Sequence, residues 1–543
     1  MPRFSLTNLP VSVLLLWGAL FASALVLPSL NTGIFASPDE TAVAVSIQRL
    51  QATGSATVPE PLAVEAPWLH PRSYVATGES LVPVGFLGWP WWLARIGFLP
   101  MTVVAWVASI VAVSGCIPWY LLLRKRFGGA AAWWGTALAW TFPAVLLYVN
   151  RSLFSHLPQY SLVLWSLWVL AATFTDELSL NKRLVRQLLS GLLFGIALSF
   201  RPMETIWLVP VFLLTLAQFG KIQWSTLLLV AAATVVGVLP LFWAQVHTYG
   251  SWFQVGYWIQ SNTDPAAVAI PQLVTGAAKP WYLVFAPYGL HPRNALWNVR
   301  SFFLSYLWPW AVATGVLVLY AISYQIALFR ERVHSRNKQV TSLVRALLVL
   351  GAVAGWLLLI YGSGLYADHV RPGAVTLANS FLRYTLPFGF VFAWAVAAFR
   401  QRLEQTRFPQ ARRLFSAAAA CLLIFGIFTA FARDEEGILA TRKELGTYTA
   451  IRAAALKAFQ PNDVILSERS DKIFFPAFKV ATPLPTKEQL SHLSQVSSST
   501  AIGLFRRPLS FTERDDWRKM GYDVREVQAF ERERLYRLTP FLR

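Results

Sequence analysis

Long apolar runs separated by short polar segments fill roughly the first 430 residues of the chain. A helix that crosses the hydrocarbon core of a membrane needs about 20 predominantly apolar residues, and eleven runs approach or reach that length. The predicted spans are 11–27, 101–123, 130–149, 157–175, 187–200, 203–219, 225–245, 302–329, 345–363, 381–399 and 414–432. This pattern predicts an all-α polytopic membrane domain over residues 1–433.

The first apolar run allows two interpretations. Val11 to Leu27 follows a lone Arg3 and precedes small residues, as the apolar part of a secretory signal peptide does. However, that part of a signal peptide spans only about 7–15 residues, and this run is longer. We therefore favour a retained membrane helix.

Basic residues indicate which loops face the cytoplasm. Cytoplasmic loops of membrane proteins collect Lys and Arg, and four basic clusters, at 124–126, 182–186, 330–338 and 400–413, fall on alternate loops. We therefore expect a multi-pass protein of the cell (inner) membrane with a cytoplasmic N-terminus. The loops at about 30–100, 246–300 and 364–380, and the segment after Arg433, are then outside.

Composition supports a protein embedded in the lipid bilayer. Hydrophobic residues make up 55% of the 543 positions, 24 residues are Trp, and the mean hydropathy is +0.47. The net charge of +20 lies mostly in the loop clusters, where the positive-inside bias and anionic lipids account for it. We expect no nucleic-acid partner. Cys116 and Cys421 both lie in apolar runs, so we expect no disulfide framework.

The polar tail, residues 434–543, alternates helix-like and strand-like segments. An amphipathic stretch covers 442–459, and short apolar runs follow at 463–467, 479–482, 500–505 and 534–538. The tail is therefore predicted to be a small extracytoplasmic α/β domain. It contains neither a glycine-rich phosphate loop nor a nucleophile elbow, so we expect no second active site there.

Acidic residues are scarce in the membrane domain, where two of them stand side by side. Only twelve of the 27 Asp and Glu residues precede Asp434, yet Asp39 and Glu40 are adjacent shortly after the first predicted span. Carboxylates at such a boundary are costly unless they contact water, a cation or a substrate. Their position therefore indicates a function.

A helix start offers a simpler explanation for the same two acids. Ser37 is a suitable N-cap, Pro38 suits the first helical position, and acids in the first turn gain about 0.3–1 kcal/mol each from the helix dipole. We expect this helix over 38–51. Capping suits any surface helix, however, and does not explain why the acids follow a membrane span so closely.

Four short motifs occur on the outer side of the predicted topology. They are Asp39-Glu40, His70-Pro71-Arg72, the stretch from Asn150 to Pro158, and Arg383-Tyr384-Thr385-Leu386-Pro387. With these motifs, roughly residues 5–435 resemble multi-span glycosyltransferases of the GT-C type, especially relatives of protein mannosyltransferases and the aminoarabinose transferases that modify lipid A. Two departures matter: Arg72 stands where relatives often have a second proline, and a TrpTrpAspTyrGly signature is absent. Transfer of a whole oligosaccharide to asparagine is therefore not expected.

The resemblance implies that one sugar moves from a polyprenyl-phosphate donor to a lipid-, glycan- or protein-linked acceptor on the outer face, with inversion. Glycosidases need two carboxyl groups beside the bond that they cleave. A polyprenyl phosphate leaves without protonation, so a single base that deprotonates the acceptor suffices. We expect Asp39 to be this base, with Glu40 in support.

The donor phosphate requires fixed positive charge near the outer leaflet. Arginine suits this role because its planar guanidinium binds phosphate oxygens in pairs and stays protonated. The main candidates are Arg383, Arg201, Arg72 and His70, and Arg293 and Arg371 are further candidates. Two simpler explanations remain: an arginine at the end of a span commonly reaches toward water, and Arg201 can pair with Glu204 three residues later.

Other functions need to be weighed against the transferase. No ligand spacing indicates a metal site and no cofactor is expected, although a divalent cation between Asp39 and the phosphate remains an alternative. A flippase or transporter of lipid-linked sugars, or a non-catalytic scaffold, would also have many spans. Transporters carry ionisable groups near mid-span and often contain paired repeats. Here the polar residues gather in outer loops and no repeat is visible, which favours the enzyme.

Overall fold

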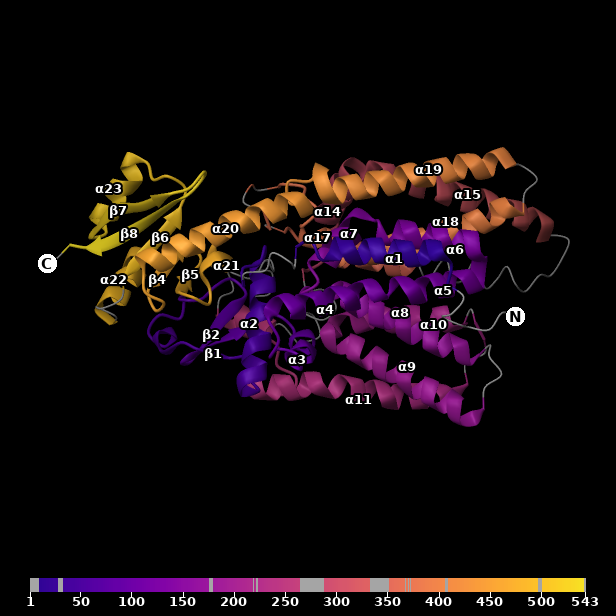
Figure 1. The fold of residues 1–543 in the computed structure, drawn as a ribbon, viewed down its shortest axis with the longest axis horizontal. Coiled ribbons are helices and arrows are strands. Elements are labelled where there is room, and N and C mark those ends of the chain that lie inside the picture. The colour runs from indigo at the N-terminus through magenta and orange to yellow at the C-terminus, as the bar shows by residue number, and fades with distance from the viewer. Residues whose placement is uncertain are drawn as a thin grey trace. The chain divides into compact units, whose positions relative to one another are not determined.

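The structure, a computed structural model, consists of two compact units (Figure 1). It describes residues 9–27, 33–174, 179–217, 219–220, 223–263, 288–332, 351–366, 368–369, 371, 373–405, 409–496 and 501–541. Unit 1 comprises Met1–Val26, Val107–Leu239 and Val268–Ala440. Unit 2 comprises Leu27–Trp106, Pro240–Ala267 and Thr441–Arg543. Several parts of the sequence analysis fall outside the described residues, among them residues 264–287 of the predicted loop 246–300, the basic residues 336, 338 and 407, and the start of the predicted span 345–363.

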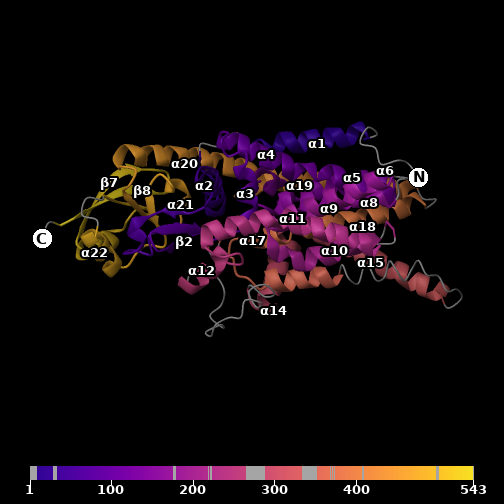
Figure 2. The same ribbon diagram turned by 90° about the horizontal axis from the view of Figure 1, so that it is seen from below.

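Helices make up unit 1 in the part of the chain that the structure describes, and its long helices run roughly along one direction (Figures 1 and 2). The α-helices of unit 1, long and short, are α1 (Val11–Ala24), α5 (Cys116–Phe127), α6 (Gly129–Trp140), α7 (Pro143–Asn150), α8 (His156–Thr173), α9 (Leu180–Phe200), α10 (Thr205–Ala217), α14 (Pro292–Asn298), α15 (Trp308–Arg332), α17 (Ser380–Tyr384), α18 (Pro387–Glu404) and α19 (Pro409–Phe428). The 3-10 helix η4 (Pro202–Glu204) and the π-helices η5 (Val299–Tyr306) and η6 (Thr429–Arg433) also belong to unit 1. Three further helices contribute residues to both units: α4 (Met101–Ser114), α11 (Trp224–Tyr249) and α20 (Ile438–Ala458).

Fewer helices than predicted are long and apolar enough to cross a membrane. Among the described residues four qualify, and two strongly bent helix pairs raise the number to six, so the eleven predicted spans are not confirmed. The four are Met101–Phe127, Leu180–Phe200, Trp224–Tyr249 and Pro409–Ala458.

Breaks inside the apolar runs explain part of this difference. The run predicted as 130–149 bends by 64° between α6 and α7. Phe142 leaves the helical conformation there, with a ψ of 127°, because the proline that follows disfavours helical backbone in the preceding residue. The run predicted as 302–329 bends by 101° where η5 meets α15. Apolar composition alone does not reveal such bends.

Two glycines allow the helices α9 and α11 to approach closely. A Cβ atom on Gly191 would lie 2.3 Å from the carbonyl oxygen of Val230, and one on Gly195 would lie 2.1 Å from that of Thr234. The Thr234 hydroxyl donates a hydrogen bond to the Gly191 carbonyl at 3.1 Å. Small residues four positions apart commonly bring membrane helices together in this way, because they let the backbones touch.

The first part of unit 2 combines a capped helix with a small antiparallel sheet. The helix α2 (Pro38–Thr53) precedes the strands β1 (Val58–Pro59), β2 (Tyr74–Thr77) and β3 (Ser80–Pro83), which pair in the order β1-β3-β2. Three short helices complete this part: η3 (Pro61–Ala63), α3 (Gly88–Ala94) and α12 (Gly256–Thr263). The apolar segment of about 81–100 is thus part strand and part short helix.

The tail forms the small α/β domain that its sequence pattern predicts. Its mixed sheet has the order β5-β4-β6-β8-β7, in which β4 pairs in parallel with β5 and β6, and β8 pairs antiparallel with β6 and β7. The strands are β4 (Val464–Ser467), β5 (Lys479–Ala481), β6 (Ile502–Arg506), β7 (Tyr522–Ala529) and β8 (Arg534–Pro540), and the helices after α20 are α21 (Asp471–Phe474), α22 (Lys487–Val496) and α23 (Phe511–Lys519). The prediction missed β7.

The hydrophobic core of the tail also receives residues from the first predicted outer loop. Ala66 and Leu69 are buried in the same cluster as Val464 and Leu504 of the sheet. A salt bridge of 3.0 Å between Lys479 and Glu60 adds a charged contact between the same two segments. The tail and this loop therefore pack together as parts of unit 2.

Candidate functional site

The helix α2 begins at the residue that the sequence predicts. Ser37 has extended backbone, and its hydroxyl accepts a hydrogen bond from the Asp39 amide at 3.1 Å. Pro38 occupies the first turn together with Asp39 and Glu40, and Gly54 ends the helix with a φ of +74°. Such a left-handed residue suits glycine because it has no Cβ atom. Local chemistry therefore fixes where the acids lie on this helix.

The two adjacent acids have different surroundings. Glu40 is buried, with only 5% of its surface exposed. Asp39 is only partly buried, and its Oδ1 atom accepts a hydrogen bond of 2.8 Å from the hydroxyl of Ser73. Ser73 itself is buried. Of the two carboxylates, Asp39 is thus the one whose position combines a fixed orientation with access from outside.

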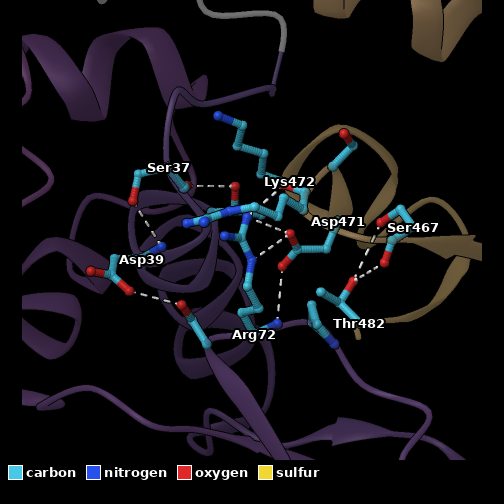
Figure 3. Close-up of polar contacts among 12 residues, drawn as sticks. Ser37, Asp39, Arg72, Ser467, Asp471, Lys472 and Thr482 are labelled. Atoms are coloured by element: carbon cyan, nitrogen blue, oxygen red, sulfur yellow. Dashed lines mark hydrogen bonds and ion pairs between the residues drawn. The ribbon is translucent and has the colours of Figure 1, made fainter. Parts of the chain in front are cut away.

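Arg72 lies against a carboxylate of the tail (Figure 3). Its backbone amide donates to Asp471 Oδ2 at 2.9 Å, while Nε and Nη2 donate to Asp471 Oδ1 at 2.9 and 2.7 Å. Nη2 also donates to the Arg469 carbonyl at 2.6 Å. These donors of Arg72 are therefore engaged within the protein, and its predicted contact with the donor phosphate stays a prediction.

His70 lies two residues earlier in the same loop. It is buried, and its Nδ1 atom is 3.0 Å from the carbonyl oxygen of Pro71. Its predicted contact with the donor phosphate stays a prediction.

In unit 1 the structure brings together the other two predicted arginines. Arg201 follows α9, Arg383 lies on α17, and both are buried, with 9% and 8% of their surface exposed. Their guanidinium carbons lie 5.3 and 5.2 Å from the centroid of the Tyr384 ring. Arg383 also donates to the Ser380 hydroxyl at 2.9 Å and lies 4.4 Å from the Phe154 ring centroid. We call Arg201, Arg383, Tyr384 and His156 the arginine cluster.

His156 belongs to this cluster, although the sequence indicates only that it stands at the edge of a loop. It is 2% exposed, and its ring centroid lies 5.5 Å from that of Tyr384 and 6.5 Å from that of Phe154. Neither ring nitrogen has a hydrogen-bond partner among the described residues. Buried polar groups in folded proteins nearly always have such a partner, so this imidazole indicates a place for a ligand that can form hydrogen bonds.

Glu204 neutralises part of the charge beside the cluster. It is 1% exposed and accepts hydrogen bonds from Arg201 Nε at 3.3 Å, from the Tyr361 hydroxyl at 2.8 Å and from the Trp207 indole. The pairing of Arg201 with Glu204 at a spacing of three residues, expected from the sequence, is therefore present. Arg201 consequently has a structural role whether or not it also binds phosphate.

Of the two further arginines weighed from the sequence, Arg371 pairs with Glu435 and Arg293 is exposed. Asp264, a further outer acid, lies outside the described residues. Among the residues that the structure describes, no group of three His, Cys, Asp or Glu side chains could hold a metal ion. Asp39 belongs to unit 2, and the arginine cluster belongs to unit 1.

Comparisons with known proteins found solved structures to which this chain is similar. No family model matches the chain, and no curated protein matches its sequence. The chain is similar to ArnT from Cupriavidus metallidurans bound to undecaprenyl phosphate, with 13% identity, a TM-score of 0.47 and coverage of 97% of both chains. It is also similar to the apo state of that protein, with 14% identity, a TM-score of 0.45 and coverage of 96% of this chain and 97% of the other.

At this level of identity, and with TM-scores below 0.5, these likenesses carry no inference about the activity of this chain.

Proposed function

We propose that this protein is a membrane glycosyltransferase that moves one sugar from a polyprenyl-phosphate donor to an acceptor hydroxyl or amine on the outer face, with Asp39 as general base. The observation that supports the proposal is the difference in burial and hydrogen bonding between the two adjacent acids. Asp39 is partly exposed and accepts a hydrogen bond from Ser73, whereas Glu40 is buried. A general base must reach the proton that it removes, and only the first of these environments suits that task.

The reaction balances with one base. The acceptor atom forms a bond to the anomeric carbon from the face opposite the donor phosphate, and the bond from that carbon to the phosphate oxygen breaks. The electron pair leaves with the polyprenyl phosphate, the acceptor proton passes to the Asp39 carboxylate, and the configuration of the sugar is inverted. Glu40 supports the base from its buried position in the same helical turn.

The arginine cluster is our candidate for the donor phosphate. Two buried guanidinium groups on the same aromatic ring concentrate positive charge, and hydrogen bonds from arginine to phosphate are strong because both partners are charged. The imidazole of His156 adds a group that needs a hydrogen-bond partner. A phosphate monoester or diester could accept from all three side chains.

The first test is transfer of labelled sugar from polyprenyl-phosphate donors in membranes that contain the protein. We expect Asp39→Asn to lower kcat by about 10²-fold or more, the loss typical of a missing general base, and Glu40→Gln to lower it less. Arg383→Ala and His156→Ala should instead raise the KM for the donor. The matched control is Glu79→Gln, an exposed acid of the same loop, which should transfer as the wild type does.

Three outcomes would contradict parts of the proposal. Equal transfer by Asp39→Asn and wild type, at equal amounts of folded protein, would remove Asp39 as the base. A larger loss with Glu40→Gln would assign the base to Glu40. Failure of the wild type with every donor, in the presence of Mg²⁺ and with a chelator, would favour a flippase or a scaffold instead.

A further inference from the structure

Asp471 holds both the backbone and the side chain of Arg72. The Arg72 amide and its guanidinium donate to the two oxygens of the same carboxylate. Asp471 is fully buried, whereas 28% of the Arg72 side chain is exposed. Because three donors of one residue converge on one buried carboxylate, the Arg72 backbone cannot rotate without breaking charged hydrogen bonds, which are the stronger kind in proteins.

Ser73, the next residue, carries this restraint to Asp39. Its carbonyl accepts from the Val84 amide at 3.0 Å, and the Tyr74 amide donates to the Pro71 carbonyl at 3.0 Å. These bonds make the segment around Ser73 a tight turn anchored on the edge of the small sheet. Its hydroxyl donates to Asp39 at 2.8 Å. A shift of this turn would therefore move the group that orients the proposed base.

The tail also holds the chain immediately before α2. Lys472 donates to the carbonyl of Ala36 at 2.6 Å, and Arg452 donates to that of Gly33 at 3.2 Å. Arg452 is anchored in turn by the carbonyls of Ile473 and Phe475. The segment around Asp471 thus contacts the first loop on both sides of Asp39 in sequence.

From this geometry we infer that Asp471 is a positioning residue for the proposed transfer: through Arg72 and Ser73 it sets the orientation of the Asp39 carboxylate. This inference deepens the proposed function and rests on it. It also assigns a positioning role in catalysis to the tail, whose sequence contains no catalytic motif. Displacement of a reacting group by about 1 Å can cost about 10²-fold in rate, so even a small movement of this turn would be measurable.

The test compares Asp471→Asn and Ser73→Ala with Asp523→Asn, the same chemical change in a more exposed ion pair of the tail. We expect the first two variants to lower kcat by about 10–100-fold, with the donor KM within about twofold of the wild type. Ser73→Ala should also move the acid limb of the kcat profile to higher pH, because Asp39 loses a donor that favours its charged form. Ser73→Thr should restore most of the rate, and Asp523→Asn should behave as the wild type.

A second measurement separates this inference from the proposed function. In the Asp471→Asn/Ser73→Ala double variant the two losses in kcat should be far from additive, because both act through Asp39. Amide hydrogen exchange over residues 38–50 should be faster in Asp471→Asn than in Asp523→Asn. Unchanged exchange and an unchanged kcat in Asp471→Asn would overturn the inference. If the wild type transfers no sugar the proposed function fails, and the exchange rates still decide whether Asp471 restrains α2.

Discussion

At the scale of single residues, the candidate sites depend on how each buried charge is compensated. Arg72 is held by Asp471 and Arg201 by Glu204, with one partner of each pair almost completely buried. Removing one partner of such a pair is far more costly than losing an exposed salt bridge, because the remaining charge has neither water nor a counter-ion. Arg201 is therefore expected to affect folding in addition to its proposed role in substrate binding, and experiments have to separate the two effects.

The pair of Arg201 and Glu204 provides such an experiment. We expect Arg201→Ala to destabilise the protein by about 3–5 kcal/mol, the cost typical of leaving one charge of a buried pair alone, and Arg201→Ala/Glu204→Gln to recover much of this loss. The measurement is the midpoint of thermal unfolding in detergent. Arg371→Ala, in the exposed pair with Glu435, is the control and should cost less than about 1 kcal/mol. A double variant no more stable than Arg201→Ala would show that the unpaired Glu204 carboxylate is not the cause of the destabilisation.

At the scale of elements, some parts of the fold could be predicted from sequence and others could not. The start of α2 and most strands of the tail depend on neighbouring residues: a serine before a proline in one case, short apolar runs in the other. The bend before Pro143 and the break at Leu307 instead divide apolar runs that look continuous. Span counting assumes straight helices, and among the described residues the eleven predicted spans are not confirmed.

For the candidate sites, too, some contacts could be predicted from the sequence and others could not. The pairing of Arg201 with Glu204 was predictable because it spans three residues of one turn. The contact between Arg72 and Asp471 joins residues 399 positions apart, and a single sequence contains no signal for it. His156 could be suspected from its motif, but its unsatisfied ring nitrogens appear only after the helices pack.

The contact between α9 and α11 gives a prediction at this scale. Gly195→Ala places a methyl group against the Thr234 carbonyl, where the Cβ atom would be only 2.1 Å away, so we expect a loss of roughly 1–3 kcal/mol from overpacking. Gly315→Ala, in α15 where nothing lies within 4 Å of the new atom, should be neutral or slightly stabilising because alanine favours helices. Unfolding midpoints in detergent compare the two. Equal midpoints would mean that α9 and α11 can separate without cost.

At the scale of the whole molecule, the predicted boundary at residue 433 does not match the compact units. Residues 27–106 and the tail from Thr441 lie in the same unit. They share a hydrophobic core through Ala66 and Leu69, and they are joined by the salt bridge of Lys479 with Glu60. The tail is therefore not an appendage that could be removed without affecting the first loop.

Removing the tail tests this organisation directly. A chain that ends at Arg433 keeps all eleven predicted spans but loses the partners of Ala66, Leu69 and Arg72, so we expect its first loop to lose structure. Limited proteolysis from the outer side should cut residues 33–100 rapidly in the shortened protein and slowly in the full chain. Transfer of sugar should be lost together with protease resistance. A shortened protein that resists the protease and transfers sugar at the normal rate would contradict both the unit and the inferred role of Asp471.

The distance in sequence between Arg72 and Asp471 also has a consequence for biosynthesis. A ribosome that adds about 5–20 residues per second needs roughly 20–80 s to extend the chain across the 399 positions between them. During that interval α2, which carries the proposed base, has already been made, but Asp471, which holds Arg72, has not. Under the proposed function, a nascent chain that has not yet reached Asp471 lacks the contact that orients Asp39, and we expect it to transfer sugar more slowly than a chain that contains Asp471.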